Sequence, residues 1–295
     1  MRFVSGVKNG VAAIIAATLF FCACSKPAKP RDGRLNVIVS SYAAYAIAKE
    51  TLKDIADIKM LIPPGVEPHH FEPSPRTAAD IAGADFFFFV SGALEPWAMQ
   101  ISDGKGIALA YQLPDTGPAD NPHVWISFKN AAVMAENMAR YIARKRPDLE
   151  HRLAQNVADF TRETQMLDRL YKISLADCQS RTIYHVGHNA FYYFAYDYKL
   201  DFEPLIGSAF DGEPSAKEMA MMIKDIKAKN TKYIFSEESM SPRLAQTIAA
   251  ETGAQILYLY TIEHVTKQEF EKQTTYKQFM TENLESLKKG LGCKI

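Results

Sequence analysis

Three histidines lie in segments whose composition suits the binding of a metal ion. His69 belongs to the proline-rich stretch 63–75, where proline fixes φ and removes backbone donors, so this loop has few conformations available. His123 lies in the motif Asn-Pro-His-Val-Trp, and His188 begins the segment His-Asn-Ala-Phe-Tyr-Tyr-Phe. Neutral imidazole is a good ligand for zinc, manganese, iron and copper. We therefore predict that one imidazole from each segment meets the others at a single divalent ion.

The remaining histidines are interpreted as surface or core residues, because an isolated histidine is more often structural than a metal ligand. His185 lies close before His188 and could still support the site through a hydrogen bond. The aromatic run at 191–194 is interpreted as core. The histidines outside the predicted site are His70, His151, His185 and His264.

Short apolar runs alternate with segments of helical spacing in both halves of the chain. Strands that are apolar on both faces predict parallel sheets covered by helices on both sides. The predicted strands are 35–40, 58–62, 86–90, 107–110, 182–186, 202–206, 233–236 and 255–259. The predicted helices around them are 42–53, 75–83, 95–100, 130–144, 188–198, 215–229, 241–253 and 276–289.

Between the two halves, residues 148–176 lack proline and glycine and carry apolar residues at helical spacing. At a rise of ~1.5 Å per residue this predicts one helix of about 40 Å. We expect an α/β protein with two lobes, each a mainly parallel four-stranded sheet flanked by helices, joined by this long rigid helix. The predicted boundaries are 34–147 for the N-terminal lobe, 148–177 for the linking helix and 178–295 for the C-terminal lobe.

All three candidate histidines follow predicted strands, with His188 at the start of a predicted helix. Ligands of open α/β sheets bind beyond the carboxyl ends of the strands. Two lobes facing one another across the long helix would place His69 and His123 on one wall of a cleft and His188 on the other.

The N-terminus is interpreted as an export signal. Arg2 and Lys8 precede an apolar run that is too short to span a bilayer, which predicts a signal peptide over residues 1–23. The segment resembles a bacterial lipoprotein signal with Cys24 as the lipidated residue, and residues 24–33 would form a tether. An ordinary cleaved signal is the alternative. We expect a periplasmic or cell-surface protein that is anchored to a membrane by lipid.

Export affects the interpretation of the two cysteines in the body of the chain. In an oxidising compartment, Cys178 and Cys293 could form a disulfide that ties the C-terminal end to the second lobe. Two free buried thiols are the alternative. Their spacing is not that of a cysteine-based zinc site.

Charge argues against nucleic acid as a partner. Lys plus Arg and Asp plus Glu are both 34, so the formal net charge is zero, whereas binding to phosphate needs a basic surplus. The apolar content of 47% is that of an ordinary folded protein.

Taken together, four segments resemble the zinc- and manganese-binding solute-binding lipoproteins of bacterial ABC importers. They are 68–73, 121–125, 188–195 and 212–215, and the resemblance extends from about Leu35 to Leu291. It implies a monomer that holds a divalent metal between two lobes and delivers it to a membrane permease with its ATPase. It also implies a binding protein and not an enzyme.

The resemblance implies His69, His123 and His188 as ligands, and histidine at the third position favours zinc over manganese. The simplest alignment places Ile262 at the acidic fourth position, so we choose its neighbour Glu263 and leave Glu67, His264 or water as alternatives. The loop 113–122 is short and lacks the histidines common in zinc members, which leaves manganese open.

Two other functions are compatible with three histidines on such a fold. A zinc hydrolase also uses three histidines and a water, but the chain has no His-Glu-x-x-His signature. An adhesin or structural lipoprotein could use the same fold without metal.

Overall fold

The computed structural model describes residues 33–114, 121–206, 214–237 and 242–294. The predicted signal peptide, the lipidation candidate Cys24 and nearly all of the predicted tether lie outside the described residues. So do Gly212 and Glu213 of the fourth family motif. Within the described part, no helix is long and apolar enough to cross a membrane.

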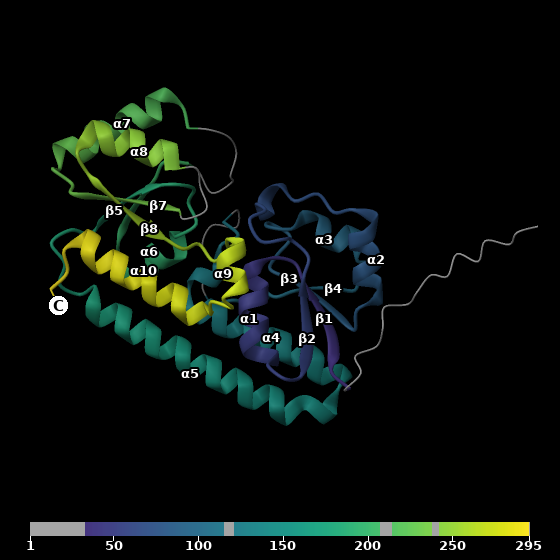
Figure 1. Cartoon of the computed structure of the whole chain (residues 1–295). Helices are drawn as coiled ribbons and strands as arrows, with labels where there is room; N and C mark the ends of the chain where they lie inside the picture. The colour runs from purple at the N-terminus through teal and green to yellow at the C-terminus, as the bar shows by residue number, and fades with distance from the viewer. Residues whose placement is uncertain (1–32, 115–120, 207–213, 238–241, 295) are drawn as a thin grey trace, which may run out of the picture.

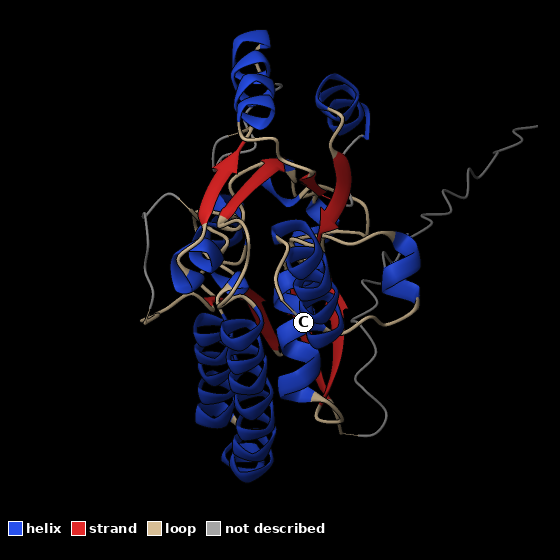
Figure 2. Cartoon of the chain, turned by 90° about the vertical axis from the view of Figure 1, so that its left-hand side faces the viewer, coloured by secondary structure: helices blue, strands red, loops and turns tan. Residues whose placement is uncertain are grey.

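Each half of the chain forms a four-stranded, fully parallel sheet, and the strand order is the same in both. The order is β2-β1-β3-β4 in the first lobe and β6-β5-β7-β8 in the second. Helices enclose the strands of both lobes (Figures 1 and 2). The strands are β1 Leu35–Val39, β2 Ala56–Met60, β3 Phe86–Phe89, β4 Gly106–Ala108, β5 Thr182–Val186, β6 Asp201–Pro204, β7 Tyr233–Glu237 and β8 Gln255–Leu259.

Two of the predicted helices begin at capping serines. Ser74 caps α2 and Ser215 caps α7, each through a capping box. The α-helices are α1 Tyr42–Leu52, α2 Pro75–Gly83, α3 Pro96–Ile101, α4 Phe128–Lys145, α5 Glu150–Ser174, α6 Tyr192–Tyr198, α7 Ala216–Ala228, α8 Pro242–Thr252, α9 Lys267–Glu271 and α10 Tyr276–Leu291. Three 3-10 turns are η1 Pro68–His70, η2 Val124–Ile126 and η3 Pro147–Leu149.

Helix α5 runs beneath both lobes and packs on α4 and α10 (Figure 1). Its 25 residues correspond to about 37 Å at the standard rise. Its buried side chains recur at helical spacing and join an apolar cluster that includes residues of both sheets. The predicted two-lobed α/β architecture with a long connecting helix is therefore confirmed.

Several predicted boundaries are wrong. The helix after β5 begins at Tyr192 and not at His188; residues 188–191 lie before it, and the backbone N–H of His188 donates to the Glu237 carboxylate. Strand β2 is shifted two residues towards the N-terminus of its predicted position, and β6 ends at Pro204. Helix α9, which Thr266 and Glu269 cap, was not predicted.

The chain crosses back to the first lobe after β8. Helix α9 and the turn after it pack on α1, where the Tyr42 hydroxyl donates to the Thr274 carbonyl at 2.6 Å. Helix α10 then returns along α5. A disulfide joins Cys178 to Cys293, so the end of α10 is tied to the segment that follows α5.

Candidate metal centre

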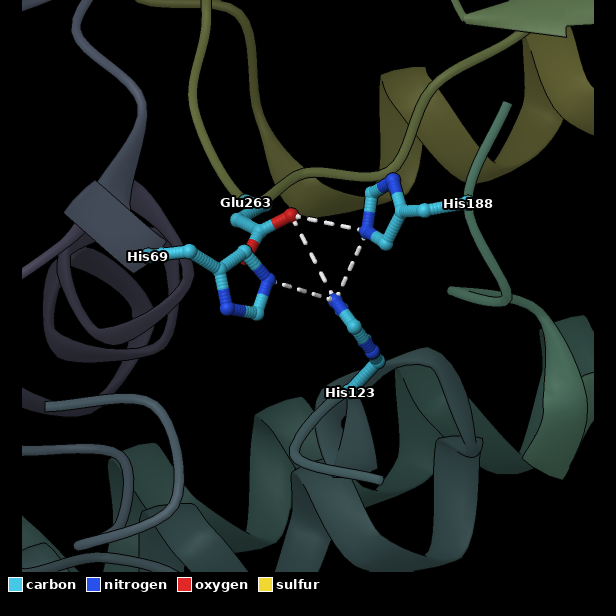
Figure 3. Close-up of side chains that lie close together, drawn as sticks. All are labelled: His69, His123, His188 and Glu263. Carbon is cyan, nitrogen blue, oxygen red and sulfur yellow. Dashed lines mark hydrogen bonds and ion pairs between the residues drawn. The ribbon is translucent and has the colours of Figure 1, made fainter. Parts of the chain in front are cut away.

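The three predicted histidines and Glu263 converge between the lobes (Figure 3). The Nε2 atom of His123 lies 3.2 Å from that of His69 and 2.8 Å from that of His188. The Glu263 carboxylate lies 2.8 Å from His69 Nε2, 3.5 Å from His123 Nε2 and 3.3 Å from His188 Nε2. Donors at 2.0–2.1 Å from a tetrahedral Zn²⁺ are about 3.3 Å apart, so this spacing fits one ion.

Each donor follows the carboxyl end of a strand. His69 lies in η1 after β2, and His123 lies in the connection that follows β4. His188 follows β5, and Glu263 follows β8. The first lobe thus supplies two imidazoles, and the second supplies an imidazole and a carboxylate, at the edges where α/β sheets bind ligands.

The four donor side chains are almost completely buried. His123, His188 and Glu263 have no exposed surface, and the His69 side chain is 10% exposed. Burial of a carboxylate among imidazoles is costly unless the charge is compensated. A divalent cation would compensate it, and the exposed edge of His69 marks the side nearest to solvent.

Asn121 fixes the orientation of His123. Its Oδ1 lies 2.9 Å from the ring Nδ1 and accepts the backbone N–H of His123 at 3.1 Å. Its Nδ2 donates to the Asn189 carbonyl in the second lobe at 2.8 Å. With Nδ1–H donating to Asn121, the Nε2 atom is left free as a ligand.

Glu237 orients the ring of His188, as Asn121 orients that of His123. This role of Glu237 was not predicted from the sequence. Its Oε1 lies 2.7 Å from His188 Nδ1 and accepts the backbone N–H at 2.8 Å. A Cβ on Gly187 would lie 2.2 Å from that oxygen, so only glycine permits this approach. The indication of this role in the sequence is that an acidic residue ends the apolar strand β7.

His185, which was predicted to support the site through a hydrogen bond, instead packs against the rings of Phe191 and Phe202.

The backbone before Glu263 explains why the acidic position was ambiguous in the sequence. Ile262 has φ of 58°, which is unusual for a β-branched residue, and its side chain is fully buried in the core. This turn directs the following carboxylate towards the histidines. The Thr261 carbonyl holds the turn by accepting Trp125 Nε1–H at 2.8 Å. Ile262 is therefore a core residue, and Glu67 and His264 lie beside the centre and not within it.

The donors have strongly perturbed proton affinities. Burial lowers the pKa of His123 to about 4. Burial also opposes protonation of His188, but the carboxylates of Glu237 and Glu263 outweigh it and raise the His188 pKa well above its usual value. Glu263 raises the pKa of His69 in the same way. Burial favours the neutral form of Glu263, yet the adjacent imidazoles hold the pKa of this carboxyl well below its usual range.

Two parallel α/β lobes on a long helix, with imidazole and carboxylate donors buried between them, are the architecture of metal-binding solute-binding proteins. The family described as zinc-uptake complex component A, periplasmic, matches residues 37–290 of this chain. The chain belongs to this family, and the resemblance inferred from its motifs is confirmed.

Individual relatives agree with this assignment. The high-affinity zinc uptake system protein ZnuA of Bacillus subtilis is 32% identical over an alignment of 311 positions, which covers 96% of this chain and 97% of the relative. The metal-dependent lipoprotein YcdH of Bacillus subtilis superimposes with a TM-score of 0.79 at 32% identity, over 88% of this chain and 100% of that structure. The Zn(II)-bound ZnuA-like domain of Streptococcus pneumoniae AdcA gives a TM-score of 0.76 at 29% identity, over 88% and 99%.

Proposed function

We propose that this protein captures Zn²⁺ outside the cytoplasm and delivers it to the membrane permease of an ABC importer with its ATPase. The observation that carries the proposal is the convergence of three Nε2 atoms and one carboxylate at tetrahedral spacing. The names of the relatives, a zinc uptake system protein and a Zn(II)-bound domain, support the choice of metal.

The donor set favours zinc over manganese. Three imidazole nitrogens with a single carboxylate suit Zn²⁺, whereas Mn²⁺ prefers oxygen donors in an octahedral arrangement. Four protein donors also leave no coordination position for a reacting water, which a catalytic zinc site retains. The geometry therefore supports a carrier more than a hydrolase.

The remaining assignments belong to the same proposal. His69, His123, His188 and Glu263 are the ligands of the inner centre, and Glu67, His264 and water do not belong to that centre. Cys24 carries the lipid anchor, with residues 24–33 as the tether. The functional units are 34–147, 148–177 and 178–295, although Phe270 of α9 and the Thr274 carbonyl contact Tyr42 of the first lobe.

Metal analysis of single variants tests the ligand set. His123→Ala and His188→Ala each remove a fully buried donor, and we expect both to lose stoichiometric zinc in competition titrations with a chelator. His151→Ala is the matched control, because His151 is exposed on α5. Retention of wild-type zinc affinity by either ligand variant would refute the proposed site. Preferential loading of manganese would refute the choice of metal.

A further inference from the structure

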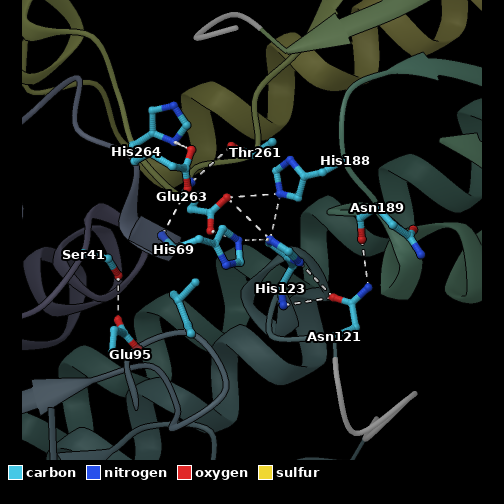
Figure 4. Close-up of polar contacts among 12 residues, drawn as sticks. Ser41, His69, Glu95, Asn121, His123, His188, Asn189, Thr261, Glu263 and His264 are labelled. Atoms are coloured by element: carbon cyan, nitrogen blue, oxygen red, sulfur yellow. Dashed lines mark hydrogen bonds and ion pairs between the residues drawn. The ribbon is translucent and has the colours of Figure 1, made fainter. Parts of the chain in front are cut away.

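A second group of metal donors lies beside the centre. Ligand atoms of Glu67, Glu263 and His264 all lie within 4.8 Å of one another. His264 Nδ1 is 3.8 Å from a Glu67 oxygen, too far for a hydrogen bond but close to the separation of two ligands on one ion. Glu263 belongs to both groups (Figure 4).

The backbone holds the two loops of this second group together. Gly65 N–H donates to the Val265 carbonyl at 2.8 Å, so the proline-rich loop is tied to the segment after β8. Gly65 has φ of 81°, a conformation that favours glycine. The Glu67 carboxylate also accepts the His69 backbone N–H at 3.2 Å, which fixes its position beside the first ligand.

His264 provides an independent indication of a ligand. Its side chain is 9% exposed, and its Nδ1 atom has no hydrogen-bond partner among the described residues. A buried ring nitrogen without a partner is costly, and a cation between it and Glu67 would satisfy it.

Glu67 is the most exposed donor of the two groups, whereas the side chains of His69 and His264 are 10% and 9% exposed. His123, His188 and Glu263 are fully buried, whereas the Glu67 side chain is 22% exposed. An ion that approaches from solvent through the outer group meets Glu67 first and then Glu263. Exchange of bound waters for protein donors in steps avoids complete dehydration of a divalent ion at one moment.

We propose that Glu67, His264 and Glu263 form an entry site that receives Zn²⁺ from solvent and passes it to the inner histidines through the shared Glu263. This inference rests on the proposed function. The entry site accelerates loading and release together, so it changes the rates more than the equilibrium affinity.

Stopped-flow mixing of the metal-free protein with Zn²⁺ tests the entry site. We expect Glu67→Gln and His264→Ala to reduce the association rate constant by roughly tenfold, with a smaller change in Kd. Glu72→Gln removes an exposed carboxylate from the same loop and is the matched control. Association at the wild-type rate in both variants would overturn the proposal. Circular dichroism checks that each variant is folded.

A background without two of the three inner histidines separates binding at the entry site from simple electrostatic attraction. The variant His123→Ala/His188→Ala should retain weak binding of one Zn²⁺ in isothermal titration, and addition of His264→Ala should abolish it. Absence of residual binding, or residual binding that His264→Ala leaves unchanged, would overturn the entry site. Failure of the wild-type protein to bind zinc would instead overturn the proposed function, and His264-dependent binding in the background variant would still stand.

Discussion

Replacement of Glu237 by glutamine tests how the protein tunes its proposed zinc ligand. Glu237 is fully buried and does not reach the cluster of ligand atoms. It accepts two hydrogen bonds from His188, at 2.7 Å from Nδ1 and 2.8 Å from the backbone nitrogen. The carboxylate therefore fixes the ring tautomer and increases the electron-donating power of Nε2. Glutamine retains the shape and one acceptor oxygen but loses the negative charge.

The expected loss of zinc affinity in the Glu237→Gln variant follows from this geometry. Loss of a hydrogen-bonding partner of a metal-bound histidine typically costs 10- to 100-fold in affinity, about 1.4–2.7 kcal/mol. Because the glutamine oxygen can still accept from Nδ1, we expect the Glu237→Gln variant to lie near the tenfold end. Gly187→Ala should cost more, because its Cβ would lie 2.2 Å from the carboxylate and displace both groups.

Competition titration against a zinc chelator, repeated between pH 6 and 8, measures the effect. Glu237 stabilises protonated His188 as well as the zinc-bound ring, since it raises the His188 pKa. Protons therefore compete with zinc more strongly in the wild type. The advantage of the wild type over the variant should grow as pH rises and shrink as pH falls.

Glu282→Gln, an exposed change of the same charge on α10, is the control. Equal zinc affinity in wild-type and Glu237→Gln protein at pH 8 would refute the positioning role. A loss of zinc affinity that does not vary with pH would indicate a purely steric effect. It would also contradict the proposed action of Glu237 through its negative charge.

Three further predictions follow from buried groups. Zinc affinity should fall as pH drops from 8 to 5, because zinc must displace protons from His69 and His188, whose pKa values are raised; a flat titration profile would contradict imidazole ligation. Burial raises the pKa of Glu95 from 4.5 to about 7. The free energy of unfolding should therefore fall by about 3 kcal/mol as pH rises across that interval. In urea titrations, the Glu95→Gln variant should lack this dependence on pH. Replacement of both Cys178 and Cys293 by serine removes a cross-link over 115 residues and should lower the free energy of unfolding by about 4 kcal/mol. Urea denaturation measures this loss, and zinc affinity is the control. An unchanged denaturation midpoint would exclude a contribution of the disulfide to stability.

Local signals predicted most of the fold. Strand β3 is four consecutive phenylalanines and buried on both faces, so its assignment needed no tertiary information. Ser74 followed by Pro75, and Ser215 followed three residues later by Glu218, are helix-start patterns of neighbouring residues, and the structure shows a capping box at both positions. The predicted helix start at His188 was wrong, and this residue instead contacts Glu237, which lies 49 residues away in the sequence.

The sequence by itself determined the architecture, the family and the three histidines, because apolar periodicity, caps and short motifs are properties of neighbouring residues. Only the tertiary structure decided that Glu263 and not Ile262 faces the histidines, since a left-handed backbone at Ile262 redirects the chain there. It alone revealed that Glu237 orients His188 across 49 residues of sequence. Such contacts depend on which strand ends lie next to one another in the folded sheets, and no pattern of neighbouring residues specifies this arrangement.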